Sequence, residues 1–326
     1  MVQIDLKDRK ILAELDLNAR MPFSQLAKNV GLSRQVVEYR IDRMKKEGMI
    51  FGAKAIFDSV KAGFNWYRIA FRLLNISEKE KNEFIQYLKN NEYVFWLGEV
   101  GGNWDIVVNF ICKDNFKFNG LFEEIIEKYG AKIRDYEILI YINVCDFNRA
   151  YLLPEKKGRN EFFHEMKYDS EIKIDEVDIK IISELSEDAW QTNIELAKKL
   201  NLAPNTIKNR IDSMMKSKLL LGFRLFINPS ALGYKSHMLF LEINKLDLEK
   251  EKELHNYLES IPNITFVVKH IGKWRIGLEI ETKDEKEFQD IFVNIRGKFS
   301  DIITNFELFP LFRDHKINYF PEGNLK

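Results

Sequence analysis

Apolar residues recur with helical spacing near the start of the chain, and the same pattern returns 170 residues later. Each stretch predicts an amphipathic helix, because residues at i, i+3 and i+4 share one helix face. The apolar faces are formed by Ile11, Leu12 and Leu15 and by Val177, Ile181 and Leu185. Asp5 and Asp175 precede these helices at the position of an N-cap, where a carboxylate accepts free backbone N–H groups.

Two further helices and an extended segment follow in each stretch. A short helix is predicted at about residues 24–29, and Ser33 caps a third helix that runs to about Glu47. In the second stretch Pro204 begins the third helix, where its missing N–H costs nothing. The inward faces are formed by Val37, Ile41 and Met44 and by Ile207, Ile211 and Met214. Residues 49–57 and 219–227 are extended, and a two-stranded ribbon after three helices is typical of a winged helix-turn-helix unit.

The rest of each half alternates between strand and helix patterns. In the first half we expect strands at 67–74, 94–100, 104–111 and 133–144, and helices at 78–90 and 116–129. In the second half we expect strands at 239–243, 264–271, 274–281 and 302–312, and helices at 248–260 and 285–299. The order β-α-β-β-α-β predicts a ferredoxin-like domain in each half. The predicted fold class is therefore α+β, with two copies of a winged helix-turn-helix followed by a ferredoxin-like domain.

The two halves are copies of one unit. Residues 4–63 align without a gap with residues 174–233, and 19 of these 60 positions are identical. We predict helix-turn-helix domains at residues 1–63 and 172–233 and ferredoxin-like domains at 64–155 and 234–326. Residues 156–171 form the predicted linker, with a short helix around Glu161–Met166.

Charge and cysteine content narrow the class of protein. The 50 Lys and Arg residues balance 50 Asp and Glu residues, which argues against a chain-wide coat that binds polyanions. Each predicted third helix is nevertheless basic, with a net charge of +3 over residues 33–46 and again over 204–218. The 2 cysteines form neither a disulfide framework nor a metal site, and no apolar run is long enough to span a membrane. We therefore expect a soluble, cytoplasmic protein without a metal or other cofactor.

Each copy resembles the leucine-responsive/asparagine regulator (Lrp/AsnC) family of prokaryotic transcription factors. The resemblance rests on residues 8–15, Leu26-Ala27, Gly31-Leu32-Ser33, Arg40-Ile41, Gly48-Met49-Ile50 with Gly52, Asn228-Pro229 and Leu232-Gly233. It implies that the helix-turn-helix units bind double-stranded DNA and that the ferredoxin-like domains bind small effectors, often amino acids. It also implies self-association through the ferredoxin-like sheets, either as a pseudo-dimer within one chain or as a homodimer.

The third helix of each copy is the expected recognition helix, with N-terminal side chains on base edges and flanking Lys and Arg on phosphates. Base reading is assigned to Arg34, Gln35 and Tyr39 and to Asn205, Thr206 and Asn209. The other candidate DNA-binding residues are Ser33, Arg40, Arg43, Lys46, Lys208 and Arg210. For Arg40 and Arg210, bracing the helix, contacting phosphate and reading a base all stay open. Because the two helices carry different donors and acceptors, we predict an asymmetric operator.

The resemblance places an effector site at the turn between the second and third strands of each ferredoxin-like domain. The family pattern Gly-x-x-Asp is present as Gly102-Asn103-Trp104-Asp105, and the Asp105 carboxylate would hold an ammonium group. The second copy has Gly272-Lys273-Trp274-Arg275, which reverses the charge and would favour an anion. The alternative is a tight turn in which the tryptophan anchors the sheet.

Two other functions match parts of this pattern. Siroheme decarboxylases have the same two-domain fold and place a histidine near the same turn, where His270 stands, but their His-Asn-Tyr signature is absent. RNA-recognition domains share the strand order, but their aromatic RNP string is absent. P-loop and zinc-protease motifs are absent as well, and nothing suggests a catalytic nucleophile. We therefore expect a DNA-binding transcriptional regulator rather than an enzyme, with a siroheme decarboxylase-like enzyme as the alternative.

Overall fold

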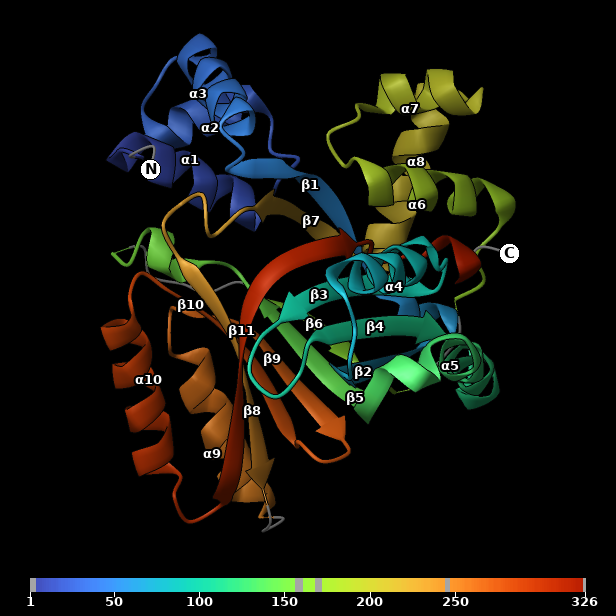
Figure 1. The fold of residues 1–326 in the computed structure, drawn as a ribbon. Helices are drawn as coiled ribbons and strands as arrows, with labels where there is room; N and C mark the ends of the chain where they lie inside the picture. Colours follow the sequence, from blue (N-terminus) through green and yellow to red (C-terminus); the bar gives the residue numbers. More distant parts are fainter. Residues whose placement is uncertain (1–3, 156–160, 168–171, 244–246, 325–326) are drawn as a thin grey trace.

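The computed structural model describes residues 4–155, 161–167, 172–243 and 247–324 of the 326-residue chain. Two helix-turn-helix units lie side by side at one end of the molecule, and a large sheet flanked by helices forms the other end (Figure 1). The mixed α+β class that we predicted is confirmed.

The helix-turn-helix units follow the predicted pattern closely. The first unit contains α1 (Leu6–Leu17), α2 (Phe23–Val30) and α3 (Arg34–Lys46), and the second contains α6 (Glu176–Glu187), α7 (Asn193–Leu200) and α8 (Pro204–Lys216). Asp5 and Asp175 cap α1 and α6, and each accepts the backbone N–H three residues on within a capping box. The predicted inward residues of α3 and α8 are buried.

The extended segment after each third helix differs from the expected ribbon in one respect. Each unit contributes a single strand, β1 (Ile50–Phe57) or β7 (Leu220–Ile227), and these two strands pair antiparallel with each other. The ribbon is therefore shared between the copies rather than formed within each. Helix α1 packs on β7 and α6 packs on β1, so one apolar core extends through both units. A lone strand leaves backbone N–H and C=O groups unpaired, and the strand of the other copy satisfies them.

The ferredoxin-like regions show the predicted element order. The first contains β2 (Asn65–Leu73), α4 (Glu78–Asn90), β3 (Val94–Val100), β4 (Ile106–Cys112), α5 (Asn115–Tyr129) and β5 (Ile133–Phe147). The second contains β8 (Lys235–Ile243), α9 (Leu248–Glu259), β9 (Ile264–Ile271), β10 (Ile276–Thr282), α10 (Glu285–Lys298) and β11 (Ile303–Ile317). Short 3₁₀ turns occur at Ser59–Ala62, Gly130–Lys132, Ala150–Leu152 and Glu322–Asn324.

The two ferredoxin-like sheets join into one closed sheet. Strand β3 pairs with β11 and β9 pairs with β5, so the last strand of each copy pairs with the second strand of the other. Within the first copy β5 also pairs with β2, which closes the ring of strands. Each strand of this ring pairs with a neighbour on both sides along at least part of its length, and the closed sheet separates an interior from the outer faces that the helices cover.

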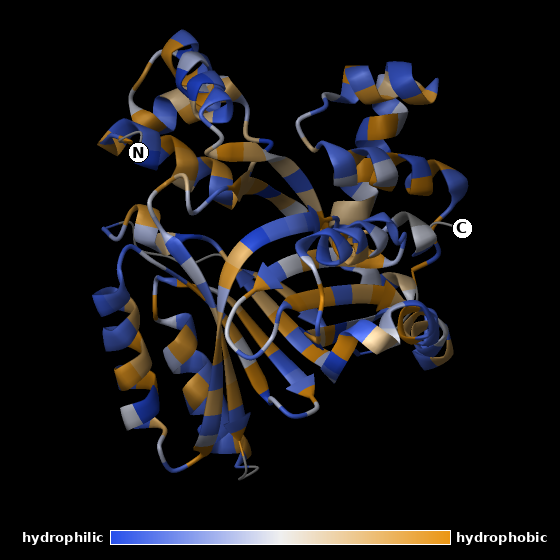
Figure 2. Ribbon diagram, viewed as in Figure 1, coloured by the Kyte–Doolittle hydropathy of each residue, from blue (hydrophilic) through white to orange (hydrophobic). Residues whose placement is uncertain are grey.

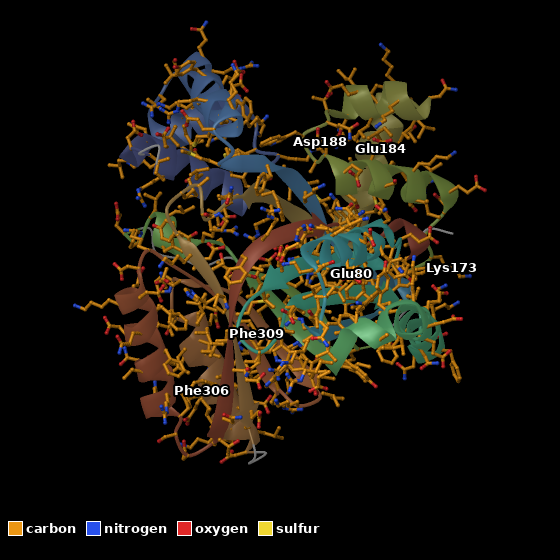
Figure 3. All side chains as sticks on the ribbon, in the orientation of Figure 1. Glu80, Lys173, Glu184, Asp188, Phe306 and Phe309 are labelled. Carbon is orange, nitrogen blue, oxygen red and sulfur yellow. The ribbon has the colours of Figure 1, made fainter. Side chains whose placement is uncertain are left out.

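Side chains of the closed sheet alternate between the helices and the interior. Tyr67, Ile69 and Phe71 of β2 belong to the apolar cluster that packs under α4 and α5. On β11, Phe306 lies 4.5 Å from the Phe292 ring of α10, whereas Phe309 lies 5.4 Å from Trp274 in a separate cluster between the copies (Figure 3). Helices α9 and α10 alternate between hydrophilic and hydrophobic residues, as expected for helices with one covered face (Figure 2).

Part of the predicted linker forms a strand, not a helix. Strand β6 (Glu161–Glu165) pairs antiparallel with the end of β5, from Asn143 opposite Glu165 to Phe147 opposite Glu161. Phe162 and His164 are buried while their neighbours are exposed, which is the two-residue period of a strand. The helix expected at Glu161–Met166 is therefore wrong, because the end of β5 offers backbone groups that an extended segment can pair with. Residues 156–160 and 168–171 of the predicted linker lie outside the described part of the chain.

Candidate functional site: nucleic-acid interface and central cavity

The base-reading candidates of the first copy lie on the outer face of α3. Arg34, Gln35 and Tyr39 are exposed, and Tyr39 keeps 69% of its surface accessible. The Arg34 guanidinium is 2.7 Å from the Glu38 carboxylate one turn further on. Ser33 caps the helix by accepting the Val36 N–H at 3.3 Å, which gives this candidate a structural role. Lys46 is exposed at the other end of the helix.

Arg40 and Arg43 are held by carboxylates at the start of α1. Arg40 is 2.7 Å from Asp5 and 2.9 Å from Asp8, and Arg43 is 2.6 Å from Asp8. The hydrogen bonds to Asp5 and then Asp8 raise the pKa of Arg40. The sequence left the role of Arg40 open, and the structure places this residue in a brace between the first and third helices.

The second unit has the same brace in a weaker form. Arg210 is 2.5 Å from Asp175 and 3.3 Å from Asp178, and Ser213 stands where the first copy has Arg43. Asn205 and Asn209 are exposed on α8, whereas Thr206 is half-buried. Lys208, which is also exposed, pairs with Asp212 at 2.5 Å. The two recognition helices therefore present different polar groups on similar backbones.

In the first copy, the candidate effector turn packs against the last strand of the other copy. Gly102 has a φ of +91°, and a Cβ atom there would lie 2.9 Å from the Leu308 carbonyl oxygen. The Asp105 carboxylate accepts the Leu73 backbone N–H at 2.7 Å. Asn103 is exposed beside it. One oxygen of the carboxylate proposed to hold an ammonium group is thus already engaged by the protein.

The matching turn of the second copy packs against the last strand of the first copy in the same way. A Cβ atom on Gly272 would lie 2.9 Å from the Ile138 carbonyl oxygen of β5. The Lys273 ammonium is 2.9 Å from Glu307, and Arg275 is 3.4 Å from Glu251.

The two turn tryptophans are buried and meet between the copies. The rings of Trp104 and Trp274 lie 5.7 Å apart in an edge-to-face contact. This packing favours the role of an anchor for both turns.

His270 lies within the sheet on β9 rather than at an open turn. Its ring is fully buried and contacts Tyr141 at 4.9 Å between centroids, and neither ring nitrogen has a hydrogen-bond partner among the described residues. Burial, assisted by the positive charge of Arg68, holds its pKa well below the usual range. The residue is a neutral component of the apolar packing, as expected for a lone histidine on a strand.

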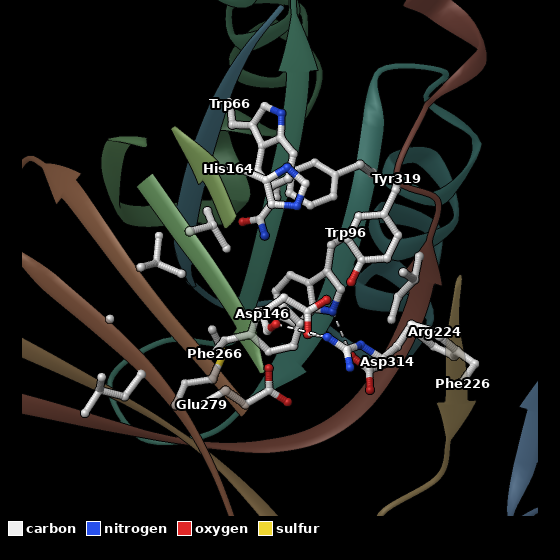
Figure 4. A pocket seen from close by; sticks show the side chains of 18 of the residues that line it. Trp66, Trp96, Asp146, His164, Arg224, Phe226, Phe266, Glu279, Asp314 and Tyr319 are labelled. Atoms are coloured by element: carbon white, nitrogen blue, oxygen red, sulfur yellow. Dashed lines mark hydrogen bonds and ion pairs between the residues drawn. The ribbon is translucent and has the colours of Figure 1, made fainter. Parts of the chain in front are cut away.

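A cavity of about 110 Å³, lined by both apolar and charged side chains, lies inside the closed sheet, at a place that the sequence did not indicate. Its wall contains aromatic side chains such as Trp66, Trp96 and Phe266, together with arginines and carboxylates from both copies (Figure 4). Among the described residues the charged members are Arg68, Arg149, Arg224, Asp146, Glu279, Glu281 and Asp314.

Two of the arginines tie the cavity to the first helix-turn-helix unit. Arg149 binds Glu281 through three hydrogen bonds of 2.9, 3.0 and 3.3 Å and also contacts Asp16 at the end of α1. Tyr151 donates a further hydrogen bond to Glu281. Arg224 is 3.2 Å from Asp146 and donates to the Asp16 carbonyl oxygen at 2.9 Å. Burial opposes the charge of Arg149, but Glu281 and Asp16 outweigh it and raise the pKa of Arg149.

The remaining two carboxyl groups of the wall differ in exposure, since Glu279 is half-buried and Asp314 is exposed. Burial, with the nearby carboxylates of Glu281 and Asp314, raises the pKa of Glu279 to about 8. The exposed Asp314 carboxylate accepts a hydrogen bond from the Trp96 indole N–H at 2.9 Å. The only sequence signal for this site was a difference between the copies, since Arg68 and Asn109 align with Met238 and Glu279.

Comparison with known proteins identifies the helix-turn-helix units. The sequence model of the AsnC-type helix-turn-helix domain matches residues 4–45 and again residues 174–215. The regulatory protein AsnC of Haemophilus influenzae is 33% identical over 106 residues, which cover 32% of this chain and 70% of that protein. The HTH-type transcriptional regulator FL11 of Pyrococcus horikoshii is 33% identical over 129 residues, or 39% of this chain and 84% of that protein. The chain belongs to the Lrp/AsnC family. It is a tandem member, with two AsnC-type units in one polypeptide.

The tandem Lrp/AsnC chain also shares its whole fold with an enzyme of known structure. The siroheme decarboxylase NirDL superimposes with a TM-score of 0.62 over 98% of this chain and 96% of that one, at 15% sequence identity. At this level of identity the similarity concerns the fold alone.

Two absences hold within the described residues. No described helix combines the length and the apolar character needed to cross a membrane. The described His, Cys, Asp and Glu side chains likewise form no group of three that could hold a metal ion.

Proposed function

We propose that this chain is a sequence-specific transcriptional regulator that reads double-stranded DNA with α3 and α8. The observation that carries the proposal is the exposed, unlike sets of polar side chains on two AsnC-type recognition helices. Both helix-turn-helix units lie at the same end of the molecule, away from the closed sheet (Figure 1). Such an arrangement suits one DNA duplex contacted by both units, as in dimeric helix-turn-helix proteins.

The two helices would read different half-sites. Arg34, Gln35 and Tyr39 offer donors and an aromatic ring, whereas Asn205 and Asn209 offer amides that suit adenine edges. Arg40, Arg43 and Arg210 would act mainly by holding the recognition helices, because carboxylates already engage their guanidinium groups. We therefore expect an asymmetric operator.

Selection of binding sites from a random DNA pool tests this proposal. Gln35→Ala and Asn205→Ala should each relax base preference in a different half of the selected site, at a cost of about 1–3 kcal/mol in binding. Lys89→Ala, which removes an exposed charge from α4, serves as the control and should change neither half. Recovery of symmetric half-sites, or loss of preference in the same half for both variants, would contradict it.

A second candidate function is that of a siroheme decarboxylase-like enzyme, because the fold match covers nearly the whole chain. The central cavity argues against it. Its volume of about 110 Å³ is far too small for a tetrapyrrole. We therefore propose that the chain is not an enzyme of this kind. Adding an iron tetrapyrrole and recording the Soret band tests this directly, and a shift of the band would restore the enzymatic proposal.

We also propose that the closed sheet replaces the pairing of separate chains. The pairings of β3 with β11 and of β5 with β9 use the sheet edges through which two chains would otherwise associate. Light scattering should then give a mass near 38.6 kDa, and twice that mass would show that chains still associate. Response to a small effector remains part of the proposal, with Gly102, Asn103 and Asp105 and Gly272, Lys273 and Arg275 as the turn candidates.

A further inference from the structure

One pair of facing residues inside the closed sheet differs between the copies in a way that changes the charge of the cavity. In the first copy Arg68 of β2 lies opposite Asn109 of β4, and Arg68 Nε donates to Asn109 Oδ1 at 2.8 Å. At the matching positions of the second copy, Met238 of β8 lies opposite Glu279 of β10. The carboxylate of Glu279 therefore has no arginine across the strand pair, and no hydrogen-bond partner among the described residues.

Other charged groups of the cavity already form ion pairs or contacts with aromatic rings. Glu281 and Asp146 are paired with Arg149 and Arg224, as described above. The Arg68 guanidinium lies over the rings of Tyr141 and Phe240, at 5.1 and 5.4 Å from their centroids. Within the described wall, the carboxylates outnumber the arginines by one. Asp314 is exposed and accepts a hydrogen bond from Trp96, so Glu279 is the carboxylate of the described wall that has neither a paired arginine nor a hydrogen bond.

Further polar atoms in the cavity wall lack partners. Asp146 and His164 are at least nine-tenths buried, yet the Oδ2 atom of Asp146 and the Nε2 atom of His164 have no hydrogen-bond partner in the described structure. Figure 4 shows both residues and Glu279 around one space. A buried polar atom without a partner costs on the order of 1–3 kcal/mol, so several around one cavity point to a bound group that completes their contacts.

We propose that the central cavity binds a small organic monocation, with Glu279 as its anionic partner. The volume limits the ligand to about five or six non-hydrogen atoms, by comparison with cavities that hold benzene. Trp66, Trp96 and Phe266 pack against its apolar part, and aromatic faces also attract a cation. Arg68 in the same wall would repel a second positive charge, so the ligand carries only one. In the free protein a proton takes the place of the cation on Glu279.

The groups that face Glu279 come from several elements. They are Arg68 on β2, Tyr141 on β5, Arg149 after β5, Glu281 on β10, Asp314 on β11 and Tyr319 after β11. The same cavity reaches α1 through Arg149 and Arg224, which both contact Asp16. Use of the site as an effector site therefore rests on the proposed DNA-binding function, but binding of the cation does not.

Calorimetric titration of the full chain with n-butylammonium tests the proposal, with n-butanol and butyrate as probes of equal length. We expect n-butylammonium alone to bind at pH 7, with release of about one proton per bound ligand in buffers of different ionisation heat. Glu279→Gln should weaken binding at least tenfold and abolish the proton release. Glu285→Gln, which removes an exposed carboxylate of α10, is the control and should bind as the parent chain does.

A second variant separates loss of the site from loss of the fold. Met238→Lys places a tethered ammonium group opposite Glu279. It should abolish binding of n-butylammonium without lowering the thermal midpoint, because the lysine takes the place of the ligand. Equal binding of n-butanol, unchanged affinity in Glu279→Gln, or no binding of n-butylammonium to the parent chain would each overturn the proposal. DNA binding is measured separately, so its failure is distinguishable from failure of this site.

Discussion

The two copies have matching backbones but use their polar residues differently. In the first copy Asp8 is almost completely buried and binds both Arg40 and Arg43, whereas Asp178 in the second copy meets only Arg210 at longer range. Inside the sheet, the first copy pairs Arg68 with Asn109, and the second leaves Glu279 facing a cavity. Apolar positions keep the fold in both copies, so the polar positions were free to specialise. The first copy has become the more tightly braced, and the second supplies the unpaired carboxylate.

The largest expected difference between the copies concerns the ends of their ferredoxin-like regions. Arg149→Met should lower the free energy of unfolding by about 3–5 kcal/mol, because it leaves the buried carboxylates of Glu281 and Asp16 without their cationic partner. Near the ends of the copies the repeat shift shortens to 167 residues, which makes Lys316 the counterpart of Arg149, and Lys316 donates to the Asn91 carbonyl oxygen. Lys316→Met should therefore cost only about 1 kcal/mol. Urea unfolding of both variants measures the contrast, and equal losses would show that the copies are equally braced.

The second contrast is a dependence of stability on pH. The pKa of Glu279 is about 8 in the folded chain, against an ordinary value of 4.5. As the pH rises between these values, the unfolded chain loses this proton while the folded chain keeps it, so stability falls and then levels off above pH 8. Glu279→Gln should remove this decline, which amounts to a few kcal/mol at most, and leave stability near pH 4 unchanged.

A matched substitution in the first copy sharpens the pH contrast. Asn109→Asp places a carboxyl group beside the Arg68 Nε atom, which stands 2.8 Å from the present amide oxygen. The added carboxyl group should lower stability with rising pH less than Glu279 does, because the guanidinium group of Arg68 stabilises its charged form. Denaturant midpoints recorded from pH 4 to 9 provide the measurement. If stability still fell with rising pH in Glu279→Gln as it does in the parent chain, groups other than Glu279 would be the cause.

The smallest expected contrast lies in the helix-turn-helix units. Asp8→Ala removes contacts with two arginines and part of a capping box, so we expect a loss of about 2–3 kcal/mol. Asp178→Ala removes the longer contact with a single arginine and the same part of a capping box at a more exposed site, and a loss of about 1 kcal/mol is expected. Thermal unfolding followed by circular dichroism compares the two. A larger loss in the second unit would reverse our view of which brace is stronger.

Much of the candidate nucleic-acid interface could be predicted before the structure was known. Helix caps, apolar faces and exposed recognition residues depend on neighbours three or four positions away, which are visible in the sequence. The roles of Arg40 and Arg210 could not be predicted, since their partners Asp5 and Asp175 are 35 residues distant. The strand β6 was missed for a related reason, because its short alternating pattern becomes decisive only beside the unpaired end of β5.

The sequence by itself determined the duplication, the order of helices and strands, and the basic character of the two recognition helices. These features follow from local periodicity and from the alignment of one half with the other. Only the tertiary structure decided that β1 pairs with β7, that the two ferredoxin-like sheets close on each other, and that Glu279 faces a cavity. Backbone hydrogen bonds between strands are the same for every residue type, so a strand's partner is chosen by long-range packing rather than by its own sequence.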